Sequence, residues 1–152
     1  MTTLEELRLA TPDHVQRAPP VGRRAPAVAA AYARHLADVR AHYESTRDFA
    51  LVTKLGFAAA AGATGRVGAC AAAAAAPPRW AAQRNAFPYE LAPGLEHYVL
   101  WSNDPRAPEL AATRVYDAFP AVPRARMHWF VNEGALRTFD DVWHAHVFID
   151  LN

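Results

Sequence analysis

The sequence predicts an α+β fold, with helices in the N-terminal part and a small, mainly antiparallel sheet in the C-terminal part. Apolar residues recur at helical spacing over residues 27–43, whereas three later segments are strand-like apolar runs bounded by turn residues. The order along the chain is helices, loop, strand, helix, strand and strand, which is typical of an α+β domain.

The composition indicates one domain, residues 1–152, that is large enough to bury a core. Apolar residues make up 52% of the chain and aromatic residues 11%. The formal net charge of +1 gives no electrostatic reason to expect nucleic acid or an anionic membrane as a partner. The single cysteine, Cys70, excludes an internal disulfide and disfavours a thiolate metal site. The chain shows neither a membrane-length apolar stretch nor a targeting-peptide pattern, so we expect a soluble cytoplasmic protein.

Residues 1–55 are expected to be the helical part of the domain. Thr3 to Glu6 match a capping box that opens a short helix, and a Pro- and Arg-rich connection follows. Residues 27–43 form the clearest helix, and a shorter one is expected at about 45–55. His35 and His42 lie seven residues apart on the long helix, and we interpret both as solvated surface residues.

Residues 56–84 are expected to form an Ala-, Gly- and Pro-rich loop. The glycines at positions 62, 65 and 68 do not have dinucleotide-fingerprint spacing, and no strand is predicted before them. The six-alanine run has helix propensity but little to bury. We therefore expect a mobile loop or a frayed helix there, with no role in phosphate binding.

Residues 85–152 are expected to be strand-rich and to carry the functional site. The predicted strands are Leu95–Trp101, Met127–Val131 and Trp143–Ile149, with a helix at Pro108–Phe119. Residues two apart on a strand share one face. The opposite face of the last strand is apolar and typical of a core-facing side: Trp143, Ala145, Val147 and Ile149.

Paired histidines on the last predicted strand are the strongest functional lead. His144 and His146 leave that strand side by side, and we take them as the candidate catalytic residues. His97, on the first strand, is a third candidate, and His128 is a weaker one. Neutral imidazole can bind a metal, transfer a proton or attack phosphorus. Four acidic residues also lie near the pair: Glu96, Asp140, Asp141 and Asp150.

Two stretches of this part resemble the signature blocks of a largely fungal family of unknown function, the N-acetylglucosamine-induced protein 1 family. These stretches are NAFPYELAPGLEHYVLW at 85–101 and WFVNEGALRTFDDVWHAHVFI at 129–149. The matching positions are Asn85, Pro88, Tyr89, Pro93, Gly94, His97, Trp129, Phe130, Asn132, His144, His146 and Val147. The chain departs from the family pattern at residues 137–139 and at Trp143. The resemblance implies membership of a family but carries no activity.

The chain is more distantly similar to histidine-triad nucleotide-binding proteins. These proteins have a strand ending in Asn, a Gly-containing turn with a Ser, and then His-x-His-x-His. The corresponding residues here are Asn132, Gly134, Thr138, His144 and His146, without the third histidine. The resemblance implies a histidine-triad-like sheet. It also implies that one histidine of the pair attacks an α-phosphate, while His97, Asn132 and Thr138 contact phosphate or ribose.

Three functions stay open at this point, and the sequence identifies no cofactor. The first is binding or processing of a phosphorylated small molecule, such as a nucleotide or nucleotide-sugar, by a hydrolase or transferase. The second is a mononuclear metal centre held by His97, His144 and His146. The third is a non-enzymatic subunit that uses its Ala/Pro-rich loop in an interface. We rank them in this order.

Overall fold

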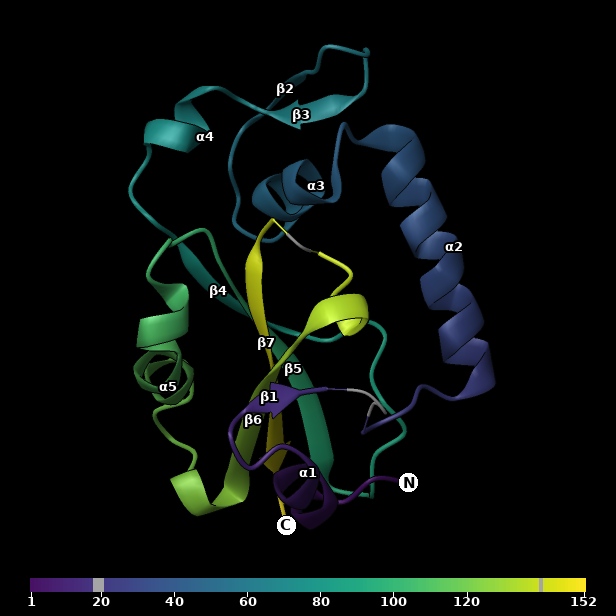
Figure 1. The fold of residues 1–152 in the computed structure, drawn as a ribbon, viewed down its shortest axis with the longest axis vertical. Helices are drawn as coiled ribbons and strands as arrows, with labels where there is room; N and C mark the ends of the chain where they lie inside the picture. Colours follow the sequence, from purple (N-terminus) through teal and green to yellow (C-terminus); the bar gives the residue numbers. More distant parts are fainter. Residues whose placement is uncertain (18–20, 140) are drawn as a thin grey trace.

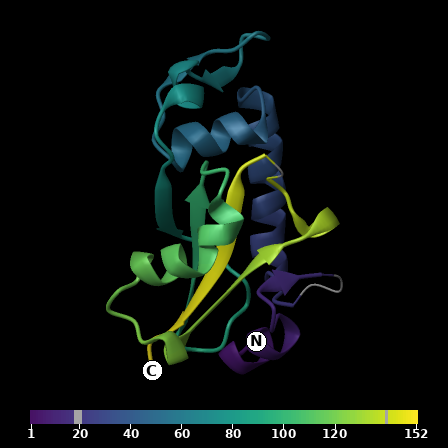
Figure 2. The same cartoon turned by 60° about the vertical axis from the view of Figure 1, so that its left-hand side comes forward.

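A central sheet organises the fold (Figure 1, Figure 2). The computed structural model describes residues 1–17, 21–139 and 141–152. Within these ranges a five-stranded sheet has the order β1-β6-β7-β5-β4. Its strands are β1 (Val15–Gln16), β4 (Trp80–Arg84), β5 (Leu95–Ser102), β6 (Met127–Asn132) and β7 (Trp143–Asp150). The β4–β5, β5–β7 and β6–β7 pairs are antiparallel, and β1 pairs with β6 in parallel. The predicted α+β class with a mainly antiparallel sheet is confirmed.

Two of the helices in the described ranges, α1 and α3, begin at side-chain caps. The bounds are α1 (Leu4–Ala10), α2 (Pro26–His42), α3 (Thr46–Thr53), α4 (Ala72–Ala75) and α5 (Ala107–Ala118). The Thr3 hydroxyl accepts a hydrogen bond from the Glu6 N–H, and the Glu6 carboxylate accepts one from the Thr3 N–H, which confirms the capping box. Ser45 caps α3 in the same way, by accepting from the Asp48 N–H. Within the described ranges, none of the helices combines the length and the hydropathy that a membrane span needs.

Helices cover both faces of the sheet. Helix α5 lies on one face, and α1, α2 and α3 lie on the other (Figure 1, Figure 2). On the α5 side, Val115 of α5 packs in a buried cluster with residues of the sheet: Leu100, Trp129, Ala145, Val147 and Ile149. On the opposite face, Val99 and Trp101 of β5 pack against Phe49 and Leu51 of α3. The apolar face predicted for the last strand is therefore a core face.

Strand β7 places its two histidines on the face that α2 and α3 cover. In the β5–β7 pair, His146 lies opposite Val99 and His144 lies opposite Trp101. Phe130 of β6 pairs with His146 from the other side. Both imidazoles therefore stand in the middle of the sheet, between two strands that carry large apolar side chains.

The loop predicted over residues 56–84 is wrong in part. The segment contains a hairpin of β2 (Ala59–Ala61) and β3 (Val67–Ala69), the short helix α4, and the edge strand β4. Strand β4 pairs along its whole length with β5. Its central residues are alanines with low strand propensity, so the pairing with β5 determines the strand more than local preference does.

Candidate functional site

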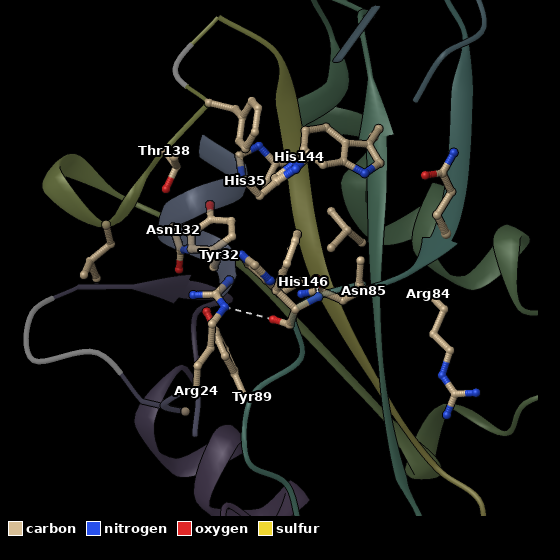
Figure 3. Close-up of a pocket in the computed structure, with 18 of the residues that line it drawn as sticks. Arg24, Tyr32, His35, Arg84, Asn85, Tyr89, Asn132, Thr138, His144 and His146 are labelled. Carbon is tan, nitrogen blue, oxygen red and sulfur yellow. Dashed lines mark hydrogen bonds between the residues drawn. The ribbon is translucent and has the colours of Figure 1, made fainter. Parts of the chain in front are cut away.

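A cavity of about 490 Å³ lies between the sheet and helix α2 (Figure 3). The connection before α2, the segment after β4 and the turn between β6 and β7 complete its wall. Four of the five residues predicted for the site line this cavity: Asn132, Thr138, His144 and His146. The volume falls within the range of about 300–1,000 Å³ that is usual for small-molecule pockets.

The paired histidines are nearly buried in the cavity wall. Their ring centroids are 5.8 Å apart and their planes are inclined by 73°. His144 stacks on Trp101 at a centroid distance of 4.8 Å. Its Nδ1 lies 3.1 Å from the carbonyl oxygen of Val142. Since a carbonyl oxygen only accepts, this contact identifies Nδ1 of His144 as a protonated nitrogen.

His97, the fifth predicted residue, lies behind the cavity wall. Only 2% of its surface is exposed. Its Nε2 is 2.9 Å from Nδ1 of His146, and its ring stacks on Phe148 at 4.4 Å. Burial lowers the pKa of His97 from 6.5 to about 3, and the nearby Arg24 contributes in the same direction. His97 therefore supports His146 from within the core as a neutral imidazole.

Burial also keeps His146 neutral. It lowers the pKa of His146 well below 6.5, and the neighbouring His97, His144 and Arg24 add to the shift. On the cavity side, Nε2 of His146 lies 3.1 Å from the side-chain amide of Asn132. Asn132 ends β6, two residues beyond the Phe130–His146 pair, and so reaches the same face.

The remaining candidates from the sequence lie outside this arrangement. His128 shares the face, but its Nε2 lies 2.7 Å from the hydroxyl of Thr11, next to α1. Glu96 forms an ion pair with Arg84, with 2.7 Å between the charged atoms. Asp140 lies outside the residues that the structure describes. Asp141 lines a different surface depression.

The described residues do not provide the three-histidine metal site. Over residues 1–17, 21–139 and 141–152, no group of three or more His, Cys, Asp or Glu side chains is arranged to hold a metal ion. The nearest nitrogens of His97 and His146 face each other at hydrogen-bonding distance. They do not converge with His144 on a shared point, as the ligands of a zinc-type site would.

Arg24 is a cavity residue that the sequence did not identify as part of the site. Its Nε donates a hydrogen bond of 2.8 Å to the carbonyl oxygen of Phe87 (Figure 3). The guanidinium lies 4.1 Å from the ring centroid of Tyr32 and 5.3 Å from that of Tyr89. These contacts hold the side chain beside Asn132 and His146.

Two further residues of the cavity wall, Lys54 and His35, come from the N-terminal helical part. Lys54 follows α3 and lines the cavity, where burial lowers its pKa. His35 was predicted to be solvated, and that prediction is wrong. It is half-buried in the cavity wall, 5.0 Å from the ring of Phe87 and 5.3 Å from that of Phe49. His42, by contrast, is exposed as predicted.

Positive charge is concentrated on the cavity wall. Arg23, Arg24, Lys54 and Arg84 all contribute to it, whereas no described residue of the wall is an Asp or Glu. Arg84 points away from the other labelled side chains and pairs with Glu96 (Figure 3). The other three cations leave the cavity electropositive in a chain whose net charge is only +1.

Fold and site together define a small α+β protein with paired histidines in an electropositive cavity. The chain belongs to the family described as "Protein of unknown function (DUF3605)", which matches residues 20–118. This match includes the first signature block, 85–101, and ends before the second. The predicted membership of a family of unknown function is thereby confirmed.

A yeast protein and a solved structure are similar to this chain. Uncharacterized protein YPL067C of Saccharomyces cerevisiae is 33% identical over 85 residues, which cover 46% of this chain and 43% of the yeast protein. The match thus spans less than half the length of that relative. The crystal structure of HTC1 superposes with a TM-score of 0.62 at 21% identity, covering 100% of this chain and 86% of that one. This likeness shows a shared fold.

Proposed function

We propose that the cavity binds a phosphorylated small molecule that carries a flat ring, such as a nucleotide or nucleotide-sugar. The observation that supports this most is the charge of the wall. Arg23, Arg24 and Lys54 border the same space as the histidine pair, without a carboxylate among the described lining residues. A cavity with one sign of charge concentrates ligands of the opposite sign, and guanidinium groups favour phosphate oxygens.

The aromatic residues of the wall support the flat ring in this proposal. Six aromatic side chains line the cavity together with the histidines: Tyr32, Phe49, Phe87, Tyr89, Trp101 and Phe139. Flat apolar surfaces of this kind stack on a nucleobase and exclude water from it. The ligand would then have its ring toward α2 and α3 and its phosphate toward Arg24, Asn132 and His146.

The histidine-triad resemblance supports the same class of ligand. The counterparts of its Asn, its hydroxyl residue and its His-x-His pair are Asn132, Thr138, His144 and His146, and all four border one cavity. We also propose that this chain is a member of the N-acetylglucosamine-induced protein 1 family, because the signature positions of that family include these two histidines. The missing third histidine leaves binding alone, hydrolysis and transfer as outcomes for experiment.

Calorimetric titration with AMP, UDP-glucose and adenosine tests the proposal. We expect AMP or UDP-glucose to bind, and adenosine to bind at least about tenfold more weakly than AMP, because it lacks the phosphate. Arg24→Gln should weaken binding of the phosphorylated ligand by about tenfold or more. Arg84→Gln is the matched control, because the Arg84 side chain is turned toward Glu96. This variant should bind the phosphorylated ligand with the same affinity as the wild type.

Circular dichroism of both variants shows whether they are folded. If neither phosphorylated compound binds the wild-type protein, the proposed ligand class is wrong. The same conclusion follows if folded Arg24→Gln binds as tightly as the wild type, because the cation would then have no part in recognition.

A further inference from the structure

Lys54 places a partly buried cation on the cavity wall. Its ammonium lies 5.5 Å from the ring centroid of Phe49, and none of the ion pairs among the described residues includes it. Burial lowers the pKa of Lys54. An ammonium that is partly removed from water without a counter-ion costs free energy of folding, and an anionic ligand would offset that cost.

The main chain holds Lys54 in place on the wall. Its N–H donates to the carbonyl oxygen of Ala50 at 2.9 Å, and its carbonyl oxygen accepts a hydrogen bond of 3.3 Å from Nε2 of Gln83 in β4. Arg79, just before β4, donates to the carbonyl oxygens of the next two residues at 3.0 and 2.8 Å. The segment after α3 is therefore tied to the edge of the sheet, and the Lys54 side chain starts from a fixed point.

Arg24 and Lys54 act on different parts of the cavity. Burial is the main reason that the pKa of His146 lies well below its ordinary value, and Arg24 is among the charges that add to the shift. For His35, burial also comes first, and the charge of Lys54 comes second. One cation therefore lies near the paired histidines, and the other lies near the middle of α2.

Aromatic rings connect the two cations. The contacts run from Arg24 to Lys54 through four rings in turn: Tyr32, Phe87, His35 and Phe49. Successive ring centroids are 5.0–5.3 Å apart. Figure 3 shows the first part of this path, with Arg24, Tyr32 and His35 in that order. A flat ring seated along these side chains would have a positive charge at either end.

We infer that Lys54 is a specificity-determining residue that binds a second anionic group of the ligand, on the side of its ring away from Arg24. This role rests on the proposed function and narrows it to nucleotides with two separate anionic groups. A second phosphate on the ribose or a carboxylate on the base supplies the counter-ion that Lys54 lacks, since both accept charge-assisted hydrogen bonds from an ammonium.

Calorimetric titration with two pairs of compounds tests the inference. AMP and adenosine 3′,5′-bisphosphate differ by a phosphate on the ribose, whereas UMP and orotidine 5′-monophosphate differ by a carboxylate on the base. In the wild type we expect the second compound of at least one pair to bind about tenfold more tightly than the first. The pair with the larger ratio identifies the position of the second anionic group.

Three variants assign this gain to Lys54. Lys54→Met removes the charge and keeps the length of the side chain, so the ratio should fall to about threefold or less. Lys54→Arg retains the charge and should keep most of the ratio. Arg84→Gln also removes a positive charge from the wall, but this side chain pairs with Glu96, so the ratio should equal that of the wild type.

Thermal denaturation separates binding from a structural role. Because the ammonium has no counter-ion in the free protein, Lys54→Met should unfold at the wild-type temperature or above it. A midpoint more than about 4 °C lower would show that Lys54 serves the fold, and it would overturn the inference.

The titrations can also overturn the inference. Equal affinities within both pairs for the wild type do so, as does a wild-type ratio in folded Lys54→Met. In either case binding of AMP or UMP leaves the proposed function standing. If none of the four compounds binds, the inference fails, and titration with UDP-glucose then decides on the proposed function.

Discussion

Individual aromatic side chains beneath the imidazoles create the apolar surroundings that keep them neutral. Phe130 and Phe148 are both fully buried. Phe130 lies 5.6 Å from the ring of His146, and Phe148 lies 4.4 Å from that of His97. An environment of this kind disfavours the charged form of each histidine. The neutral state of His146 and His97 therefore depends on two residues, Phe130 and Phe148, that do not line the cavity.

Phe130→Ala should test how much these residues also contribute to stability. Removing a fully buried phenyl ring leaves a cavity in the core, and we expect the free energy of unfolding to fall by about 3–5 kcal/mol. Urea denaturation followed by circular dichroism measures the loss. Leu151→Ala is the control, since Leu151 is 58% exposed and its change should stay within about 0.5 kcal/mol. A loss below about 1 kcal/mol for Phe130→Ala would show that the core repacks around the gap.

At the scale of elements, alternation in the sequence predicted the strands that carry the histidines. The period of two identified both faces of β5 and β7, because one face of each strand packs on α5. Strand β4 could not be found in this way, since Ala81 and Ala82 lack the branched or aromatic side chains typical of strands. Its position follows from the free edge of β5, which is a tertiary feature.

The candidate site was likewise predicted only where its residues are close together in the sequence. His144, His146, Asn132 and Thr138 belong to one strand–turn–strand unit, so local pattern was enough to group them. Arg24 and Lys54 lie more than 75 residues earlier and reach the cavity only because the N-terminal helices cover the sheet. Sequence spacing holds no signal for such a contact in a single chain.

Helix α1 offers a test of an element whose start was predicted from its capping box. Thr3→Ala removes the hydroxyl that accepts from the Glu6 N–H, and it should reduce the free energy of unfolding by about 1 kcal/mol. Thermal and urea denaturation measure the effect. Glu5→Gln lies in the same turn outside the capping box and should change stability by less than about 0.5 kcal/mol. Equal losses in the two variants would show that charge, and not the cap, matters at this helix end.

For the molecule as a whole, two neutral histidines inside the core link stability to pH. The pKa of His97 is about 3 in the folded state and near 6.5 when the chain is unfolded, and burial lowers that of His146 in the same direction. Between these values the unfolded chain binds more protons than the folded one. The stability that depends on keeping these two histidines neutral is therefore fully present above about pH 6.5, and it is lost as the pH falls toward 3.

Replacing His97 should flatten this acid dependence. One such histidine contributes a slope of up to about 1.4 kcal/mol per pH unit, so His97→Gln should lose stability less steeply below about pH 6.5. Urea denaturation at a series of pH values measures both curves, and the parallel course expected above that pH is the internal control. Identical slopes for the two proteins in the acid range would mean that His97 is protonated without cost in the folded state.

The position of strand β7 matters during synthesis, because β7 follows both β5 and β6 in the sequence and yet lies between them in the sheet (Figure 1). On the ribosome, β5 and β6 emerge with the edges that will face β7 still unpaired, and such edges attract other chains. The sheet closes only when residues 143–150 insert between them. The two histidines belong to that strand, so the step that closes the sheet also assembles the site.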